Sequence, residues 1–117
     1  MKVIDIQKLL DADILCGNAL TDLNTDYVFG TDMMSDVLAF AEDCATLVTG
    51  LCNPQVVRTA EMLDINCIVF VCGKVPGDNI LSLAEMKDMA ILTTKHSMFT
   101  SCGILYSNGF RTSGRCF

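Results

Sequence analysis

The stretch INCIVFVC, residues 65–72, decides the fold of this 117-residue chain. It is the most apolar segment of the sequence, it is rich in β-branched residues, and Gly73 follows it at once. A largely apolar segment of this length, ended by a turn residue, is typical of a strand that is covered on both faces. We therefore expect residues 65–72 to form a central strand of a parallel sheet.

Strand and helix patterns alternate around this segment. After residue 45 the sequence predicts strands at residues 45–49 and 89–93, and helices that begin at Asn53-Pro54, at residues 76–78 and at Ser97. Before it, we expect a helix over residues 3–10, strands at 12–16 and 26–29, and a helix capped by Asp32. The fold class that follows is α/β, with a mainly parallel sheet flanked by helices.

The length of the chain suits one hydrophobic core. We expect a single domain over residues 1–109, because the last helix pattern ends near Asn108-Gly109, and a flexible C-terminal tail over residues 110–117.

The composition is that of a folded protein that associates with itself. Hydrophobic residues make up 51% of the sequence and charged residues 19%, which excludes intrinsic disorder. This apolar fraction is high for a small domain, whose large surface normally needs polar cover. We therefore expect a homodimer that buries part of the apolar surface.

Net charge and hydropathy exclude two classes of partner. The net charge is −6, so a nucleic acid would be repelled by the overall field. No apolar run approaches the roughly 20 residues of a membrane-spanning helix, and the first residues lack the apolar core of a signal peptide. We expect a cytoplasmic protein that binds neither nucleic acid nor membrane.

Seven cysteines raise the question of a metal site or disulfides. No two of them form a C-x-x-C pair, and the chain has one histidine, so we expect no metal and no cofactor. Most have apolar neighbours and are predicted to pack as small hydrophobic residues, with free thiols as in a reducing compartment. The cysteines are Cys16, Cys44, Cys52, Cys67, Cys72, Cys102 and Cys116.

Small and hydroxylic residues gather where the predicted strands end and the next helices begin. In open parallel sheets this edge binds ligands, because helix N-termini present free amides there. The candidate ligand-binding residues are Asp32, Ser35, Thr49, Gly50, Asn53, Gly73, Thr94 and Ser97. They predict a pocket for a small anion or nucleotide. The alternative is that they serve only as helix caps and tight turns, which any α/β domain needs.

The sequence contains no recognisable catalytic motif. A P-loop, a G-x-S-x-G elbow and a G-x-G-x-x-G fingerprint are all missing from it. His96 stands between a strand and a helix start, where a general base could act, but an exposed loop residue is the simpler interpretation. Cys52 lies near a helix N-terminus, which can lower the pKa of a thiol, although packing under the loop explains it equally. We expect no catalytic residue and no enzyme activity.

The order of these segments resembles the DRTGG domain family. Residues 30–39 (GTDMMSDVLA) resemble that family's aspartate-x-x-serine helix start, and residues 47–50 (LVTG) its threonine-glycine turn. The helix after this turn, the apolar strand with its terminal glycine (residues 67–73) and the strand at residues 90–94 follow in the same order. The resemblance covers nearly the whole chain, from residue 2 to about residue 109.

The resemblance implies a fold like the N-terminal domain of HPr kinase/phosphorylase. The family is also found beside CBS domains in regulated pyrophosphatases and within some phosphotransacetylases, where it is a regulatory or dimerising module and not the catalytic one. The function we expect is therefore a non-catalytic regulatory or scaffolding module, homodimeric, that binds a small anionic or nucleotide ligand. Two other functions stay open: a small enzyme that uses Cys52 or His96, and a pure protein–protein adaptor.

Overall fold

A five-stranded sheet in the order β1-β5-β4-β3-β2 forms the centre of the computed structural model, which describes residues 1–41 and 45–112. The strands are β1 (Asp13–Cys16), β2 (Tyr27–Gly30), β3 (Ala45–Thr49), β4 (Cys67–Phe70) and β5 (Ala90–Thr93). Strands β2 to β5 are parallel, and β1 pairs with β5 in the antiparallel direction. This arrangement confirms the predicted α/β class with a mainly parallel sheet.

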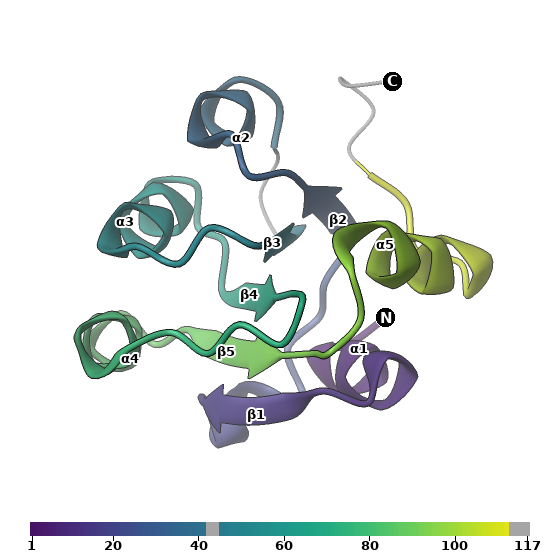
Figure 1. Cartoon of the computed structure of the whole chain (residues 1–117), viewed down its shortest axis with the longest axis horizontal. Coiled ribbons are helices and arrows are strands. Elements are labelled where there is room, and N and C mark those ends of the chain that lie inside the picture. The colour runs from purple at the N-terminus through teal and green to yellow at the C-terminus, as the bar shows by residue number, and fades with distance from the viewer. Residues whose placement is uncertain (42–44, 113–117) are drawn as a thin grey trace.

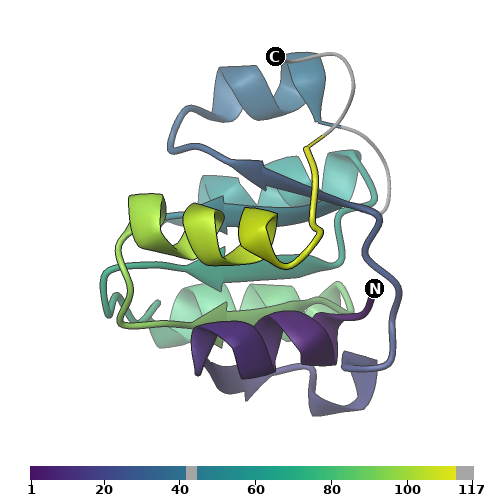
Figure 2. The same ribbon diagram turned by 90° about the vertical axis from the view of Figure 1, so that its right-hand side faces the viewer.

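Helices cover both faces of the sheet. They are α1 (Val3–Leu10), α2 (Met34–Phe40), α3 (Pro54–Met62), α4 (Asp78–Met86) and α5 (Met98–Ser107), with a short 3₁₀ helix, η1 (Asn18–Leu20), after β1. Figure 1 shows α2, α3 and α4 together on one face and α1 with α5 on the other. Figure 2, turned by 90°, shows α1 and α5 side by side in front of the strands.

The central strand β4 explains why two separate cores form. Its side chains alternate, so that Ile68 and Phe70 pack under α2, α3 and α4, while Cys67 and Val69 pack toward α1 and α5. All four residues are buried, which confirms the predicted strand with two covered faces. The strand is shorter than the eight-residue segment predicted, because only residues 67–70 pair with the neighbouring strands.

Two helix starts follow directly from local sequence. The side chain of Asn53 accepts a hydrogen bond from the Val56 amide at 3.3 Å, and Pro54 occupies the first position of α3. The Ser97 hydroxyl oxygen accepts a hydrogen bond from the Thr100 amide at 3.1 Å at the start of α5. Both caps satisfy amides that have no partner inside the helix.

The prediction that Asp32 caps the next helix is wrong. Met33 is the N-cap residue of α2, and no side chain caps this helix. The Asp32 carboxylate instead accepts hydrogen bonds from residues at the end of β3. The buried Gly50 amide needs an acceptor, whereas the side of the first α2 turn that carries the exposed Ser35 and Asp36 can be hydrated.

The chain stays packed beyond the last helix. We expected a tail from residue 110, yet Phe110 is buried, and the carbonyl of Arg111 accepts a hydrogen bond from the Val28 amide of β2 at 2.9 Å. Residues 113–117 of the expected tail lie outside the described residues. Within the described ranges, no helix has the length and apolar character needed to cross a membrane.

Candidate functional site

One edge of the sheet gathers most of the candidate residues. The carboxyl ends of the parallel strands β2 to β5 meet there, and β1 begins at the same edge because it runs antiparallel to β5, with Asp13 paired to Thr93. The loops at this edge connect to the N-termini of α2, α3, α4 and α5. Such an edge is the usual ligand site of open α/β sheets.

Asp32, Thr49 and Gly50 form a hydrogen-bonded cluster at the ends of β2 and β3. Oδ1 of Asp32 accepts the Thr49 hydroxyl at 3.0 Å and the Gly50 amide at 2.7 Å. The Thr49 oxygen in turn accepts the Leu51 amide at 3.1 Å. These three predicted residues therefore lie together, although most of their polar groups are hydrogen-bonded within the cluster.

Lys74 completes this cluster and was not among the predicted residues. Its ammonium group donates to the Gly50 carbonyl at 2.8 Å, while its own carbonyl accepts the Thr93 hydroxyl at 2.6 Å. A single lysine spans the ends of β3 and β5 in this way. The sequence feature that could have indicated Lys74 is its position directly after Gly73, the glycine that follows the predicted central strand.

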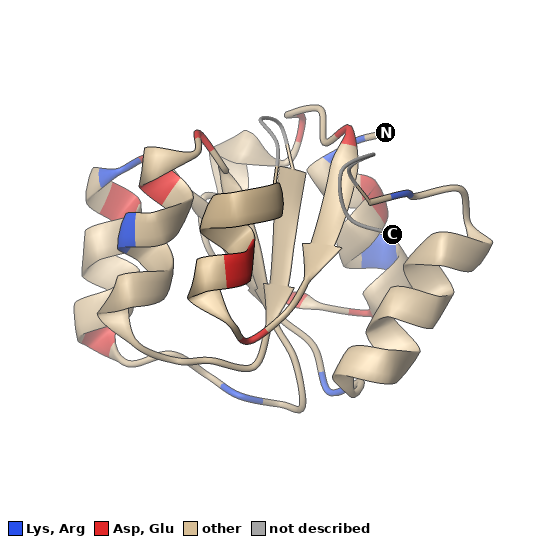
Figure 3. Cartoon of the chain, turned by 90° about the horizontal axis from the view of Figure 1, so that it is seen from above, with Lys and Arg blue, Asp and Glu red and all other residues tan. Residues whose placement is uncertain are grey.

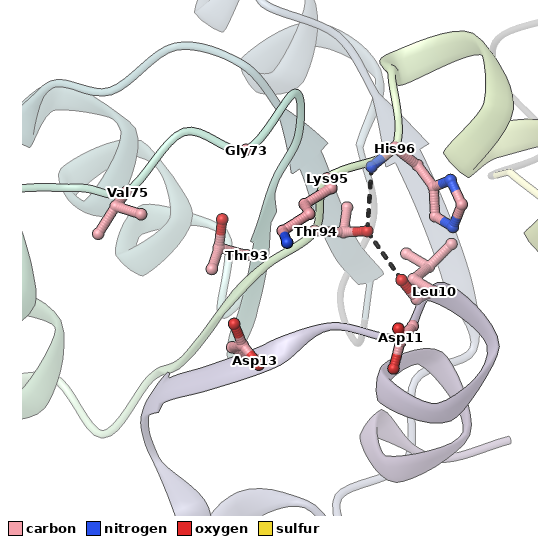
Figure 4. Close-up of a pocket in the computed structure, with 9 residues that line it drawn as sticks. All are labelled: Leu10, Asp11, Asp13, Gly73, Val75, Thr93, Thr94, Lys95 and His96. Atoms are coloured by element: carbon pink, nitrogen blue, oxygen red, sulfur yellow. Dashed lines mark hydrogen bonds between the residues drawn. The ribbon is translucent and has the colours of Figure 1, made fainter.

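A pocket of about 430 Å³ lies beside this cluster, between the α1–β1 turn and the ends of β4 and β5. Its volume is in the usual range of roughly 300–1,000 Å³ for small-molecule sites. Figure 4 shows the residues that line it. They are Leu10, Asp11, Asp13, Gly73, Val75, Thr93, Thr94, Lys95 and His96.

The pocket has charged groups of both signs. Lys95 and His96 stand on the loop that leads into α5, and Asp11 and Asp13 flank the start of β1. Figure 4 shows the Lys95 ammonium group and the Asp13 carboxylate directed into the same opening. A ligand here meets a basic wall and an acidic wall at once.

Thr94 fixes the floor of the pocket. Its hydroxyl is buried and donates to the Leu10 carbonyl at 2.8 Å, which joins the end of β5 to the end of α1 (Figure 4). The same oxygen accepts the His96 amide at 3.4 Å. This predicted residue lines the pocket, but its hydroxyl is already engaged inside the protein.

Two residues with a left-handed backbone conformation connect the loop after β4 to the loop after β5. Cys72 and Gly73 have φ angles of 61° and 68°, and their amides donate to the carbonyls of His96 and Thr94, each at 2.8 Å. A Cβ added to Gly73 would meet no atom within 4 Å, so the backbone angle favours glycine there and crowding does not. The loop after β4 is thus clamped onto the loop after β5.

The remaining predicted residues lie apart from the pocket. Asn53 and Ser97 act as the caps described above. Ser35 is exposed in the first turn of α2. The structure therefore places Gly73 and Thr94 in the pocket and Asp32, Thr49 and Gly50 in the adjacent cluster.

The cysteine prediction holds only in part. Cys67 is fully buried, and burial raises the pKa of its thiol to about 12. Cys16 and Cys102 are half-buried, but Cys52 and Cys72 are exposed, so these two are not core residues. For Cys72 the reason is that β4 ends two residues earlier and the chain then turns. Two further cysteines, at positions 44 and 116, lie outside the described residues.

The surroundings of Cys52 do not lower the pKa of its thiol, as activation of a nucleophile would require. Partial burial raises the pKa of Cys52, and the nearby Lys74 charge lowers it by a smaller amount. In the part of the chain that the structure describes, no three histidine, cysteine, aspartate or glutamate side chains are placed to hold a metal ion.

Comparison with known proteins identifies the family. The sequence model of the DRTGG domain matches residues 5–107. The chain belongs to the DRTGG domain family. No curated protein matches the chain significantly.

A solved DRTGG structure shares the fold. It is the regulatory region of a Clostridium perfringens pyrophosphatase, with CBS and DRTGG domains, in complex with its activator diadenosine tetraphosphate. The superposition has a TM-score of 0.73 at 17% sequence identity and covers 89% of this chain. It covers 45% of that chain, so this DRTGG protein spans less than half of the relative's length.

Proposed function

We propose that this DRTGG protein is a non-catalytic regulatory domain, homodimeric, that binds a nucleotide in the pocket between α1, β1 and the end of β5. The observation that carries the proposal is the pairing of a basic and an acidic wall in one pocket. The side chains of Lys95 and His96 suit a phosphate group. The carboxylates of Asp11 and Asp13 suit hydrogen-bond donors such as ribose hydroxyls or a base amino group.

The acidic wall favours a nucleotide over a simple anion. Two carboxylates near a phosphate or carboxylate ion would repel it. The hydroxyl and amino groups of a nucleoside can instead donate hydrogen bonds to these carboxylates. The activator bound by the pyrophosphatase regulatory region is a dinucleotide, which belongs to the same chemical class. The homodimer is supported by the high apolar content of the chain and by large apolar side chains that remain exposed.

Calorimetric titration tests the ligand class. We expect diadenosine tetraphosphate, ATP or AMP to bind the purified chain, and triphosphate and adenosine alone to bind more weakly. Lys95→Ala should weaken nucleotide binding at least about tenfold, because a charge-assisted contact to phosphate is lost. Arg58→Ala is the control, since it also removes one positive charge, but from an exposed position on α3.

Asp13→Asn separates the two ligand classes. If the carboxylate receives hydrogen bonds from a nucleoside, the variant binds nucleotide more weakly; if the site takes only anions, the variant binds triphosphate and nucleotide more tightly. Asp36→Asn, on exposed α2, is the matched control for the change of charge. Tighter binding in Asp13→Asn, or no nucleotide binding by the unmodified chain, would overturn the proposed ligand.

A further inference from the structure

The charge of the pocket between α1, β1 and the end of β5 depends on one side chain. Its lining contains two carboxylates, from Asp11 and Asp13, and one ammonium group, from Lys95. These charges leave a net −1 when His96 is neutral and zero when His96 is protonated. His96 is the only histidine of the chain, and imidazole is the side chain whose charge ordinarily changes between about pH 5 and pH 8.

The backbone of His96 is fixed at the pocket, while its side chain is available to a ligand. The His96 amide donates to the Thr94 hydroxyl oxygen at 3.4 Å, and the His96 carbonyl accepts the Cys72 amide at 2.8 Å. Figure 4 shows the imidazole ring turned toward the end of α1. Among the described residues the ring has no hydrogen-bond or ion-pair partner. Both ring nitrogens therefore remain for a ligand.

The elements around the imidazole add no other group that titrates near neutral pH. Besides the two carboxylates and Lys95, these elements contain Lys8 in the last turn of α1 and the exposed Cys72 and Lys74 in the loop after β4. The sequence of α5 contains no charged residue, and Figure 3 shows this helix without a blue or red segment. Carboxylates ordinarily gain a proton below about pH 5, and thiols and ammonium groups lose theirs above about pH 8.

We propose that the pocket binds a nucleotide together with a proton, which His96 takes up, so that the affinity rises as the pH falls from about 8 to about 6. This inference rests on the nucleotide site of the proposed function and adds the regulation of that site by pH. A lining with a net negative charge repels a phosphate group, whereas an imidazolium ion cancels that charge and donates charge-assisted hydrogen bonds. Bound nucleotide and bound proton therefore stabilise one another by the same factor.

The sign of the effect follows from the charge of the free pocket. At the alkaline end of this range the pocket has lost the proton, and binding must recover it at a cost in free energy. At the acidic end the proton is already in place. The dissociation constant therefore decreases as the pH falls, and it levels off once the free pocket is fully protonated.

The choice of ligand keeps the titration of phosphate out of the measurement. The terminal phosphate of AMP or ATP gains a proton of its own near about pH 6, which would oppose the effect. In diadenosine tetraphosphate every phosphate is linked on both sides, so none gains a proton in this range. This dinucleotide is therefore the probe.

Calorimetric titration with diadenosine tetraphosphate at pH 6, 7 and 8, at constant ionic strength, tests the inference. We expect the dissociation constant to be at least about threefold higher at pH 8 than at pH 6, because a charge-assisted contact to phosphate is lost. Titrations at pH 7 in two buffers with different ionisation enthalpies count the protons exchanged, and we expect a net uptake on binding.

Two substitutions fix the charge at this position. His96→Asn is neutral throughout and should bind weakly at all three pH values, whereas His96→Lys is charged throughout and should bind tightly even at pH 8. Asn66→His, added to His96→Asn, is the matched control, because it restores one histidine at an exposed position before β4, at the opposite edge of the sheet. This double variant should also be insensitive to pH. Circular dichroism checks that each variant is folded.

The outcomes separate this inference from the proposed function. Equal affinity at pH 6 and pH 8, weaker binding at pH 6, or a pH dependence that persists in His96→Asn would overturn the coupling to His96 and leave the nucleotide site in place. No nucleotide binding at any of the three pH values would overturn the nucleotide site and the coupling with it.

Discussion

Oδ1 of Asp32 accepts a hydrogen bond from the Thr49 hydroxyl, with the two oxygens 3.0 Å apart, and this bond ties the segment before α2 to the end of β3. The same oxygen accepts the buried Gly50 amide at 2.7 Å. We expect Asp32→Ala to lower the free energy of unfolding by about 1–3 kcal/mol, since it leaves that amide without an acceptor. Asp32→Asn retains an oxygen at the same place and should lose less. Urea denaturation of the two variants measures the difference.

Asp26→Ala is the matched control for this change, because it removes an exposed carboxylate just before β2. If it lowered the free energy of unfolding as much as Asp32→Ala does, the loss would come from net charge and not from the hydrogen bonds.

The buried hydroxyl of Thr94 should contribute to stability through its bond to the Leu10 carbonyl at 2.8 Å. Thr94→Val keeps the shape of the side chain but removes the donor, and we expect a loss of about 1–2 kcal/mol in the free energy of unfolding. Thr94→Ser keeps the hydroxyl and should lose less. A loss in Thr94→Ser with none in Thr94→Val would show that the methyl group, and not the hydrogen bond, matters here. Guanidinium denaturation at constant pH gives both values.

Local sequence was sufficient for most of the secondary structure. The bounds of α1 and β3 match the prediction, and the α3 and α5 starts were found because Asn53 and Ser97 cap helices through neighbours only three residues away. Apolar periodicity and capping act over a few residues, so they can be read along the chain. The antiparallel direction of β1 could not be read, because its partner β5 lies far away in sequence.

The candidate site was harder to predict for the same reason. The partner of Asp32 is an amide 18 residues away, and Lys74 reaches a carbonyl 24 residues away. Neither distance leaves a local pattern. Asp11 and Asp13 line the pocket only because β1 is antiparallel to β5. The sequence does not show this strand direction, so these two residues could not be assigned to the site from it.

Stability should fall at alkaline pH through Cys67. Burial raises the pKa of its thiol to about 12, above the 9.0 of an ordinary cysteine, so between these values the unfolded chain loses this proton first and the folded chain retains it. The free energy of unfolding then decreases as the pH rises, by up to about 1.4 kcal/mol per pH unit from this group. Cys67→Ala should show a shallower decrease between pH 9 and 11 in urea titrations, whatever its stability at pH 7. Parallel slopes in the two proteins would contradict this prediction.

Ser101 on α5 offers a stabilising substitution. Its hydroxyl is buried and has no hydrogen-bond partner among the residues that the structure describes. Ser101→Ala removes this unsatisfied group and also introduces a better helix former, so we expect the free energy of unfolding to rise by about 1–2 kcal/mol. Ser82→Ala, at an exposed position of α4, gains only the helix propensity of about 0.5 kcal/mol and serves as the control. Because the two substitutions are chemically identical, the difference between them isolates the cost of the buried hydroxyl. A gain at Ser101 no larger than the gain at Ser82 would mean that the hydroxyl finds a partner in solution, such as a buried water.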